Sequence, residues 1–250
     1  MKTIISETAE ELGHKAGSHA AALLRRAIEQ KGGARLLMST GASQFTTIDA
    51  LLKEAVDWRR VELFHLDEYI GMADTHPASF RRYLRERFIS HVNLKAAFLV
   101  DATGDLDALF VRLTAELERA PMDLGLIGIG ENTHIAFNDP PADFDDPASF
   151  KVVRLDETCR AQQFGEGWFP ALADVPTQAV SMTVSRIMKC ERIISAVPYA
   201  VKARAVNETL TNDVTNNIPA TILKTHPDFH LFIDFDSAAL TDPAVFARYA

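Results

Sequence analysis

Short apolar segments alternate with amphipathic helical patterns along most of this chain, and that alternation constrains its fold more than any other feature. The clearest apolar segments are Arg35–Thr40, Val61–Leu66 and Leu124–Ile129. They are too short for helices and apolar on both faces, which is typical of strands in a parallel sheet that helices cover on both sides. Further strand candidates share this character: Ala97–Val100, Ala179–Thr183, Arg192–Val197 and His230–Asp234.

Helical periodicity fills the intervals between these segments. Apolar residues recur every three or four positions from Leu12 to Ile28, and Gly32-Gly33 ends that helix. The other predicted helices are Ser79–Val92, Asp107–Arg119 and Lys202–Leu210. The alternation predicts an α/β fold, a mostly parallel doubly wound sheet with helices on both faces, formed as a single domain by residues 1–250. In that architecture ligands bind beyond the carboxyl ends of the strands.

The composition narrows the function classes. With 26 Lys and Arg against 34 Asp and Glu, the 250-residue chain carries a formal net charge of −8, which argues against a general nucleic-acid binder. No apolar run approaches signal-peptide length at the start or the ~20 residues of a membrane span, so we expect a cytoplasmic protein without membrane association. The two cysteines, Cys159 and Cys190, fit reduced thiols in or near the core. A homo-oligomer is compatible with the sequence.

Two segments near opposite ends of the chain are candidates for anion binding. Ser39–Gln44 combines small and hydroxyl-bearing residues between a strand and a helix, where backbone N–H groups can close on an anion. The other interpretation is an ordinary capped turn, and the segment lacks the Gly-Lys-Ser/Thr of a nucleoside-triphosphate loop. Lys202 opens a predicted helix, where a cation opposes the helix dipole unless an anion binds there as well. The alternative is a solvated surface lysine.

Asp67 and Glu68 directly follow the second strand, at the edge where a ligand would bind. A carboxylate there could act as a general base, and the alternative is a helix-capping acid beside a salt-bridged neighbour. Both interpretations stay open on the sequence alone.

The loop after the central strand opens with Gly-Ile-Gly at residues 128–130, but it lacks the third glycine of a dinucleotide-binding fingerprint. His134 stands among Asn132, Asn138 and Asp139, a polar cluster suited to proton transfer. No second His or Cys lies at ligand spacing nearby, so we expect no metal.

Three segments resemble the glucosamine-6-phosphate deaminase (isomerase) family. They are Leu66–Gly71, His76–Phe80 and Gly128–Pro140, of which His-Ile-Ala-Phe-Asn at 134–138 is the most specific. The resemblance continues in order over nearly the whole chain. It implies a modified Rossmann-like α/β fold, shared with the 6-phosphogluconolactonases. It also implies a phosphorylated sugar as substrate, and neither a metal nor an organic cofactor.

The resemblance also implies roles for individual residues. Asp67 would abstract the C2 proton of the open-chain sugar, and His134 would open the pyranose ring by moving a proton to and from the ring oxygen. The phosphate would be held by Lys202 and by the hydroxyl-rich loop, Thr40, Gly41, Ala42 and Ser43.

Several positions depart from the family pattern. Asn132-Thr133-His134 stands where the family has Asp-Gly-His, and Asp139 replaces a Glu, which keeps the carboxylate but shortens its reach. The phosphate-binding Arg of the family has no clean match, and the local candidates are Arg160, Gln162 and Gln163. Two alternatives therefore stand beside a deaminase: a 6-phosphogluconolactonase-type hydrolase and a non-catalytic sugar-phosphate sensor.

The expected activity is the isomerisation and deamination of an amino-sugar phosphate, glucosamine 6-phosphate to fructose 6-phosphate and ammonia. The predicted catalytic residues are Asp67, Glu131, Asn132, His134 and Asp139. The predicted substrate- and phosphate-binding residues are Thr40, Gly41, Ala42, Ser43, Glu68, Gly130, Arg160, Gln163 and Lys202.

Overall fold

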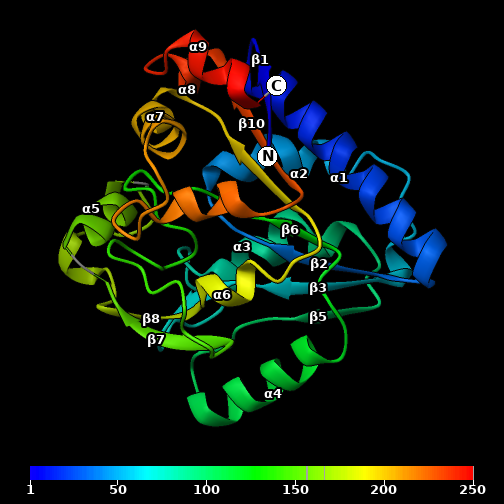
Figure 1. Ribbon diagram of the computed structural model, residues 1–250. Helices are drawn as coiled ribbons and strands as arrows, with labels where there is room; N and C mark the ends of the chain where they lie inside the picture. The colour runs from blue at the N-terminus through cyan, green and yellow to red at the C-terminus, as the bar shows by residue number, and fades with distance from the viewer. Residues whose placement is uncertain (156, 166, 250) are drawn as a thin grey trace.

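A seven-stranded parallel sheet forms the centre of the molecule (Figure 1). The computed structural model describes residues 1–155, 157–165 and 167–249. The strand order is β1-β10-β9-β6-β2-β3-β5, and every described pair is parallel. The bounds are β1 Lys2–Ser6, β2 Ala34–Met38, β3 Val61–His65, β5 Ala96–Phe98, β6 Leu124–Leu126, β9 Ile193–Val197 and β10 Phe229–Asp234. The predicted mostly parallel α/β fold is confirmed.

Helices cover both faces of this sheet because its strands are apolar on both sides. On β2, Leu36 and Met38 face one core cluster while Leu37, between them, faces the other. The first cluster is covered by α1 (Ala9–Lys31), α2 (Phe45–Leu51) and α3 (Phe80–Arg87). The second is covered by α4 (Leu106–Glu118), α6 (Val184–Ile187) and α7 (Ala203–Thr211). In the described chain, no helix has both the length and the apolar character needed to cross a bilayer.

A second, three-stranded sheet lies outside the parallel sheet. It consists of β4 (Asp67–Tyr69), β8 (Gln178–Met182) and β7 (Phe150–Arg154) in the order β4-β8-β7, with both pairs antiparallel. The predicted strand Ala179–Thr183 therefore exists but belongs to this small sheet. Neither β4 nor β7 was predicted, because β4 has three residues, two of them acidic, and β7 carries two basic residues among five and buries only Phe150. Strand β4 carries Asp67.

The remaining helices lie after β7 and near the C-terminus: α5 Glu157–Gly165, α8 Phe235–Ala238 and α9 Pro243–Phe246. The predicted helix Ser79–Val92 is shorter than expected, since α3 ends at Arg87 and a 3-10 turn, Ile89–His91, follows it. Ser79 caps α3 with its hydroxyl, which accepts a hydrogen bond from the Arg82 N–H.

Candidate active site

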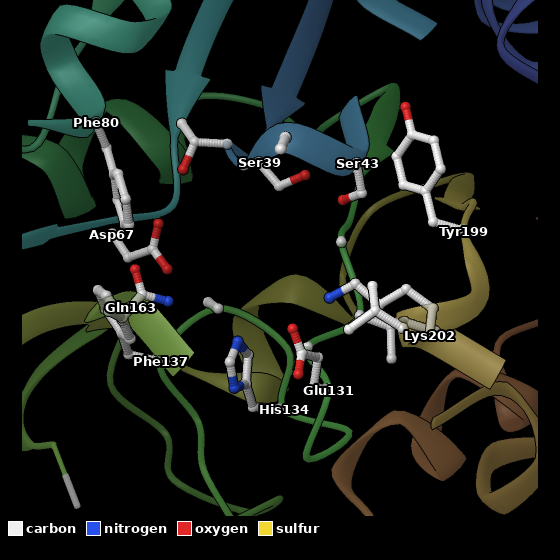
Figure 2. A pocket seen from close by; sticks show the side chains of 18 residues that line it. Ser39, Ser43, Asp67, Phe80, Glu131, His134, Phe137, Gln163, Tyr199 and Lys202 are labelled. Carbon is white, nitrogen blue, oxygen red and sulfur yellow. The ribbon is translucent and has the colours of Figure 1, made fainter. Parts of the chain in front are cut away.

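A cavity lies beyond the carboxyl ends of the parallel strands, the edge at which the sequence predicts a ligand. It encloses about 860 Å³ of empty space, its open mouth included. Its walls come from the loop after β2, strand β4, the loop after β6, helix α5 and the turn after β9 (Figure 2). Segments far apart in sequence thus contribute to one site.

Most of the predicted site residues line this cavity, and four do not. Those that line it are Thr40, Gly41, Ala42, Ser43, Asp67, Gly130, Glu131, His134, Gln163 and Lys202. Those outside its lining are Glu68, Asn132, Asp139 and Arg160. The environment of each explains the difference.

The loop after β2 is held in place by hydrogen bonds to α3 and β9. Gly41 adopts φ +111°, which glycine tolerates without the Cβ penalty. Its carbonyl accepts a hydrogen bond of 2.9 Å from the Tyr83 hydroxyl. Gln44, buried behind the loop, donates to the Ala196 carbonyl on β9 at 3.2 Å. These contacts fix the backbone of residues 40–43 against the cavity.

Asp67 presents its carboxylate to the cavity from β4, although the residue is only 7% exposed. Burial raises the pKa of Asp67 to about 8, the nearby charge of Glu68 adds to that rise, and a hydrogen bond from the Phe137 N–H opposes it. A carboxyl group whose pKa lies near the working pH can both accept and return a proton. Asp67 therefore has the properties of a general base.

Glu68 is not a cavity residue, which corrects the prediction that it binds substrate. Its fully buried carboxylate accepts hydrogen bonds from the Ser79 hydroxyl at 2.9 Å and from the Arg81 N–H at 2.9 Å, at the start of α3. The Arg81 guanidinium lies 3.5 Å away. Glu68 is therefore the helix-capping acid of the alternative interpretation. Successive side chains of a strand point to opposite faces, so Asp67 faces the cavity and Glu68 faces the start of α3.

His134 enters the cavity because Gly130 has no side chain. A Cβ at residue 130 would lie 2.4 Å from ring atoms of His134, so the imidazole packs directly on the glycine backbone. The loop closes on itself through the Gly130 N–H, which donates to the His134 carbonyl at 2.9 Å. Gly130, predicted to bind substrate, thus also creates the space for His134.

Asp139 supplies the carboxylate beside the imidazole. Its Oδ1 lies 3.1 Å from His134 Nδ1, and the Asn132 amide donates to the same oxygen at 2.9 Å. The Asn132 side-chain oxygen accepts a hydrogen bond of 3.2 Å from the backbone N–H of His134. Asn132 is uncharged, but it hydrogen-bonds both to the Asp139 carboxylate and to the backbone of His134. Asp139 lies close to the imidazole although its side chain is shorter than the Glu of the family pattern.

Opposing effects set the pKa of Asp139. Burial alone would raise it, but the neighbouring His134, the Asn132 amide and a hydrogen bond from the Cys159 thiol lower it below its usual range. Asp139 is therefore ionised at neutral pH. A carboxylate in this position can hold the tautomer of His134 and stabilise its protonated form.

Two residues of this loop have left-handed backbone conformations: Thr133, with φ +70°, and Ala136, with φ +49°. A β-branched residue such as Thr133 rarely adopts such a φ. The Thr133 N–H donates to the Gly130 carbonyl at 3.0 Å, and its own carbonyl accepts from the Ala220 N–H at 2.9 Å. Strained residues at a cavity are frequently part of a functional site.

Neither Arg160 nor Gln163, two of the candidates for the missing phosphate-binding Arg, lies beside the loop of residues 40–43. Arg160 donates to the carbonyls of Val175 at 3.2 Å and Leu172 at 2.9 Å, so it ties α5 to a neighbouring turn outside the cavity. Gln163 lines the cavity, but it accepts a 2.6 Å hydrogen bond from the Tyr69 hydroxyl and lies at the Asp67 end in Figure 2. The side chain of Gln162 lies outside the described part of the chain.

Lys202 and Glu131 face the cavity at the end opposite Asp67 (Figure 2). Lys202 is only 8% exposed, which excludes the solvated surface lysine. It belongs to the turn Ala200–Lys202, which follows Tyr199, a residue with φ +79°. The Tyr199 N–H donates to the Asp234 carboxylate at 3.0 Å, which fixes this turn on β10.

Sequence reasoning missed several lining residues: Phe80, Gly128, Ile129, Ala136, Phe137, Tyr199 and Val201. Ser39, the first residue of the predicted anion-binding segment Ser39–Gln44, also lines the cavity. Its buried hydroxyl has no hydrogen-bond partner among the described residues. The aromatic wall of Phe80 and Phe137, whose rings stack at 5.6 Å, has no local sequence signature.

Comparisons with known proteins identify the family of this chain. Residues 7–231 match the family described as glucosamine-6-phosphate isomerases/6-phosphogluconolactonase. A glucosamine-6-phosphate deaminase of Exiguobacterium sibiricum is 33% identical over 96% of this chain and 93% of its own length. One from Thermoanaerobacter pseudethanolicus is 32% identical over 96% and 95%.

Solved structures extend the comparison. A monomeric glucosamine-6-phosphate deaminase superposes with a TM-score of 0.87 at 29% identity, covering 96% of this chain and 100% of that one. The 6-phosphogluconolactonase of Thermotoga maritima, at 14% identity and a TM-score of 0.77, shares the fold over 93% of this chain and 99% of its own. With the family match spanning most of the sequence, this chain belongs to the glucosamine-6-phosphate isomerase/6-phosphogluconolactonase family.

Proposed function

We propose that the protein converts glucosamine 6-phosphate and water to fructose 6-phosphate and ammonia. The observation that carries the proposal is the presence of Asp67 and the Asp139-supported His134 on one cavity, with Lys202 at its far end. The curated relatives named above, at 32–33% identity over most of their length, are glucosamine-6-phosphate deaminases.

Binding begins at the phosphate. The loop of residues 40–43 and the Lys202 ammonium hold the phosphate at one end of the cavity, which directs the sugar carbons toward Asp67. Glu131 lies between His134 and Lys202 in Figure 2, where it can contact the sugar or orient the lysine.

The chemistry needs two proton carriers. His134 accepts the proton of the C1 hydroxyl and delivers it to the ring oxygen, so the bond from C1 to the ring oxygen breaks and the open-chain aldehyde forms. Asp67 removes the C2 proton while the 2-ammonium group of the substrate passes a proton to the C1 oxygen, which gives an enolamine. Asp67 then returns its proton to C1, which leaves an iminium at C2. Water adds to C2, ammonium leaves, and the ketose forms. The substrate supplies its own electron sink, so no organic cofactor enters the proposal.

A 6-phosphogluconolactonase-type hydrolase is the principal alternative, because lactonases share this fold. At 14% identity that likeness concerns the fold alone. Lactonases continue the histidine into a Thr-Ala-Ser-like stretch and typically carry Arg after Asp-Glu, whereas this chain has Ile135-Ala136-Phe137 and Tyr69 there. These features favour the deaminase.

The purified protein should be tested with glucosamine 6-phosphate, other hexosamine and hexose 6-phosphates, and 6-phosphogluconolactone. We expect equal amounts of ammonia and fructose 6-phosphate from glucosamine 6-phosphate only. Faster opening of the lactone would replace the proposal with the hydrolase. Saturable binding of the sugar phosphates without turnover would favour the sensor. A cytoplasmic location and the oligomeric state stay predictions.

A further inference from the structure

Beside the cavity, three side chains with different donor atoms converge: His134, Asp139 and Cys159. One nitrogen, one oxygen and the sulfur all lie within 4.8 Å of one another. His134 and Asp139 come from the loop after β6, whereas Cys159 lies on α5 and is fully buried. Sequence spacing alone excluded a metal because no cysteine is near His134 in the chain, and the fold brings one there.

The arrangement is compact enough for a small cation. His134 Nδ1 and Asp139 Oδ1 are 3.1 Å apart. Ligand atoms on a tetrahedral Zn²⁺ are about 3.3–3.8 Å apart, given metal–ligand bonds of about 2.0–2.3 Å. The widest separation in the cluster is 4.8 Å, so about 1 Å of side-chain movement is enough to close the site.

Charge balance also fits a divalent cation. The Cys159 thiol donates a hydrogen bond to the Asp139 carboxylate. A metal that binds the sulfur releases this proton to solvent, which leaves one thiolate, one carboxylate and one neutral imidazole. Two negative charges then face a 2+ ion, so the buried complex is neutral. The mixed nitrogen, oxygen and sulfur donors suit Zn²⁺ or Cd²⁺ and disfavour Mg²⁺ or Ca²⁺.

We propose that His134, Asp139 and Cys159 form a binding site for one thiophilic divalent cation, Zn²⁺ in particular, and that its occupancy stops proton transfer by His134. A metal on Nδ1 leaves the proton on Nε2, so the ring cannot accept another. Because His134 lines the cavity, a cation on its Nδ1 bears directly on the proton transfer proposed for this residue. The binding site stands independently of the proposed deaminase activity, and only the inhibition depends on it.

Cadmium reports directly on the thiolate. We expect one equivalent of Cd²⁺, added to substrate-free protein, to produce a thiolate-to-metal charge-transfer band in the ultraviolet. Cys159→Ser should abolish the band, and His134→Gln should weaken binding at least tenfold. Cys190→Ala is the matched control, because Cys190 is the other buried cysteine and lies outside the cluster. A band that survives Cys159→Ser or disappears in Cys190→Ala would overturn the site.

The activity arm measures inhibition relative to the uninhibited rate of each variant. Zn²⁺ should inhibit the wild-type enzyme with the affinity found in competition against Cd²⁺, a chelator should restore the rate, and Cys159→Ser should be at least tenfold less sensitive. Stoichiometric binding that leaves turnover unchanged would refute the block of His134. The expected band in a protein that turns over no sugar phosphate would support the site and contradict the proposed function.

Discussion

Two aspartates lie close to one histidine-bearing cavity, yet their surroundings shift their pKa values in opposite directions. Asp67 is buried in the cavity wall next to Glu68, and burial together with the Glu68 charge raises its pKa to about 8. Asp139 is half-buried behind His134, and His134, Asn132 and Cys159 lower its pKa. A carboxyl group that gains and loses its proton near neutral pH suits a base, and one that stays charged suits a support for an imidazole. The contrast supports the different roles proposed for two residues of the same type.

Replacing Asp67 should have the largest effect. Asp67→Asn keeps the shape of the side chain but removes the proton acceptor, so we expect kcat to fall at least about 10³-fold while the dissociation constant of the substrate changes little. Steady-state kinetics and calorimetric binding measure the two quantities. Asp107→Asn, at an exposed position on α4, is the matched control and should behave as wild type. A variant that retains its kcat would remove Asp67 from the role of base.

Displacing His134 should have the next largest effect, and a single methyl group can do it. A Cβ at Gly130 would lie 2.4 Å from the ring, so Gly130→Ala should push the imidazole away from Asp139 and lower kcat about 10²-fold. The control is Gly104→Ala, outside the cavity lining, where an added Cβ would meet no atom within 4 Å. Equal losses in the two variants would mean that the packing of His134 on Gly130 is unimportant.

The support given by Asp139 should be separable from that of Asn132. Asp139→Asn removes the charge next to the imidazole, and we expect kcat to fall about tenfold, since the ring stays in the cavity. Asn132→Asp adds a second carboxylate 2.9 Å from the first, so it should bring no gain in kcat and should destabilise the fold. A faster Asn132→Asp enzyme would show that Asp139 does not supply the counter-charge.

Asp67 also links activity to stability through pH. In the folded protein its pKa lies near 8, above the 3.8 of a free carboxyl, so between these values the folded state binds the proton more tightly and loses stability as the pH rises. Activity should rise over the upper part of the same range, because the base must be ionised. Asp67→Asn should therefore be more stable than wild type by an amount that grows by about 1 kcal/mol or more from pH 6 to 8.

Urea denaturation of both proteins at several pH values tests this relation. A stability difference that stays constant with pH would place the pKa of Asp67 near its ordinary value and weaken the contrast with Asp139.

The sequence predicted the parallel sheet and most of the cavity lining because both depend on local patterns. Strands buried on both faces are continuous apolar runs. The residues that follow such strands lie at the carboxyl edge of the sheet in any parallel α/β arrangement. What depends on side-chain direction could not be predicted: Glu68 caps α3, and Arg160 on α5 donates to the carbonyls of Leu172 and Val175. The small antiparallel sheet was missed because β4 has three residues.

The pairing of Asp139 with His134 could be predicted from the sequence only in part. Sequence comparison identified Asn132 and Asp139 as departures, but their joint effect depends on a loop geometry that puts Oδ1 at 3.1 Å from the ring. Cys159 is the clearest failure of spacing rules, since it reaches the same cluster from a different element.

The smallest expected effect concerns the backbone strain that shapes the His134 loop. Thr133 has φ +70°, is 1% exposed and buries a hydroxyl with no partner among the described residues. Thr133→Gly removes the strain and the buried hydroxyl but gains chain entropy in the unfolded state, so we expect a net stabilisation of about 1 kcal/mol. Thr133→Ala removes the hydroxyl while keeping a Cβ at positive φ, so it should gain less stability.

If the strain holds His134 against Asp139, the Thr133→Gly variant will be more stable and will have a lower kcat, because the loop can then leave the strained conformation. A more stable variant with unchanged kcat would make the strain incidental to the support of His134, and a less stable one would show that the Thr133 methyl group contributes more than the strain costs.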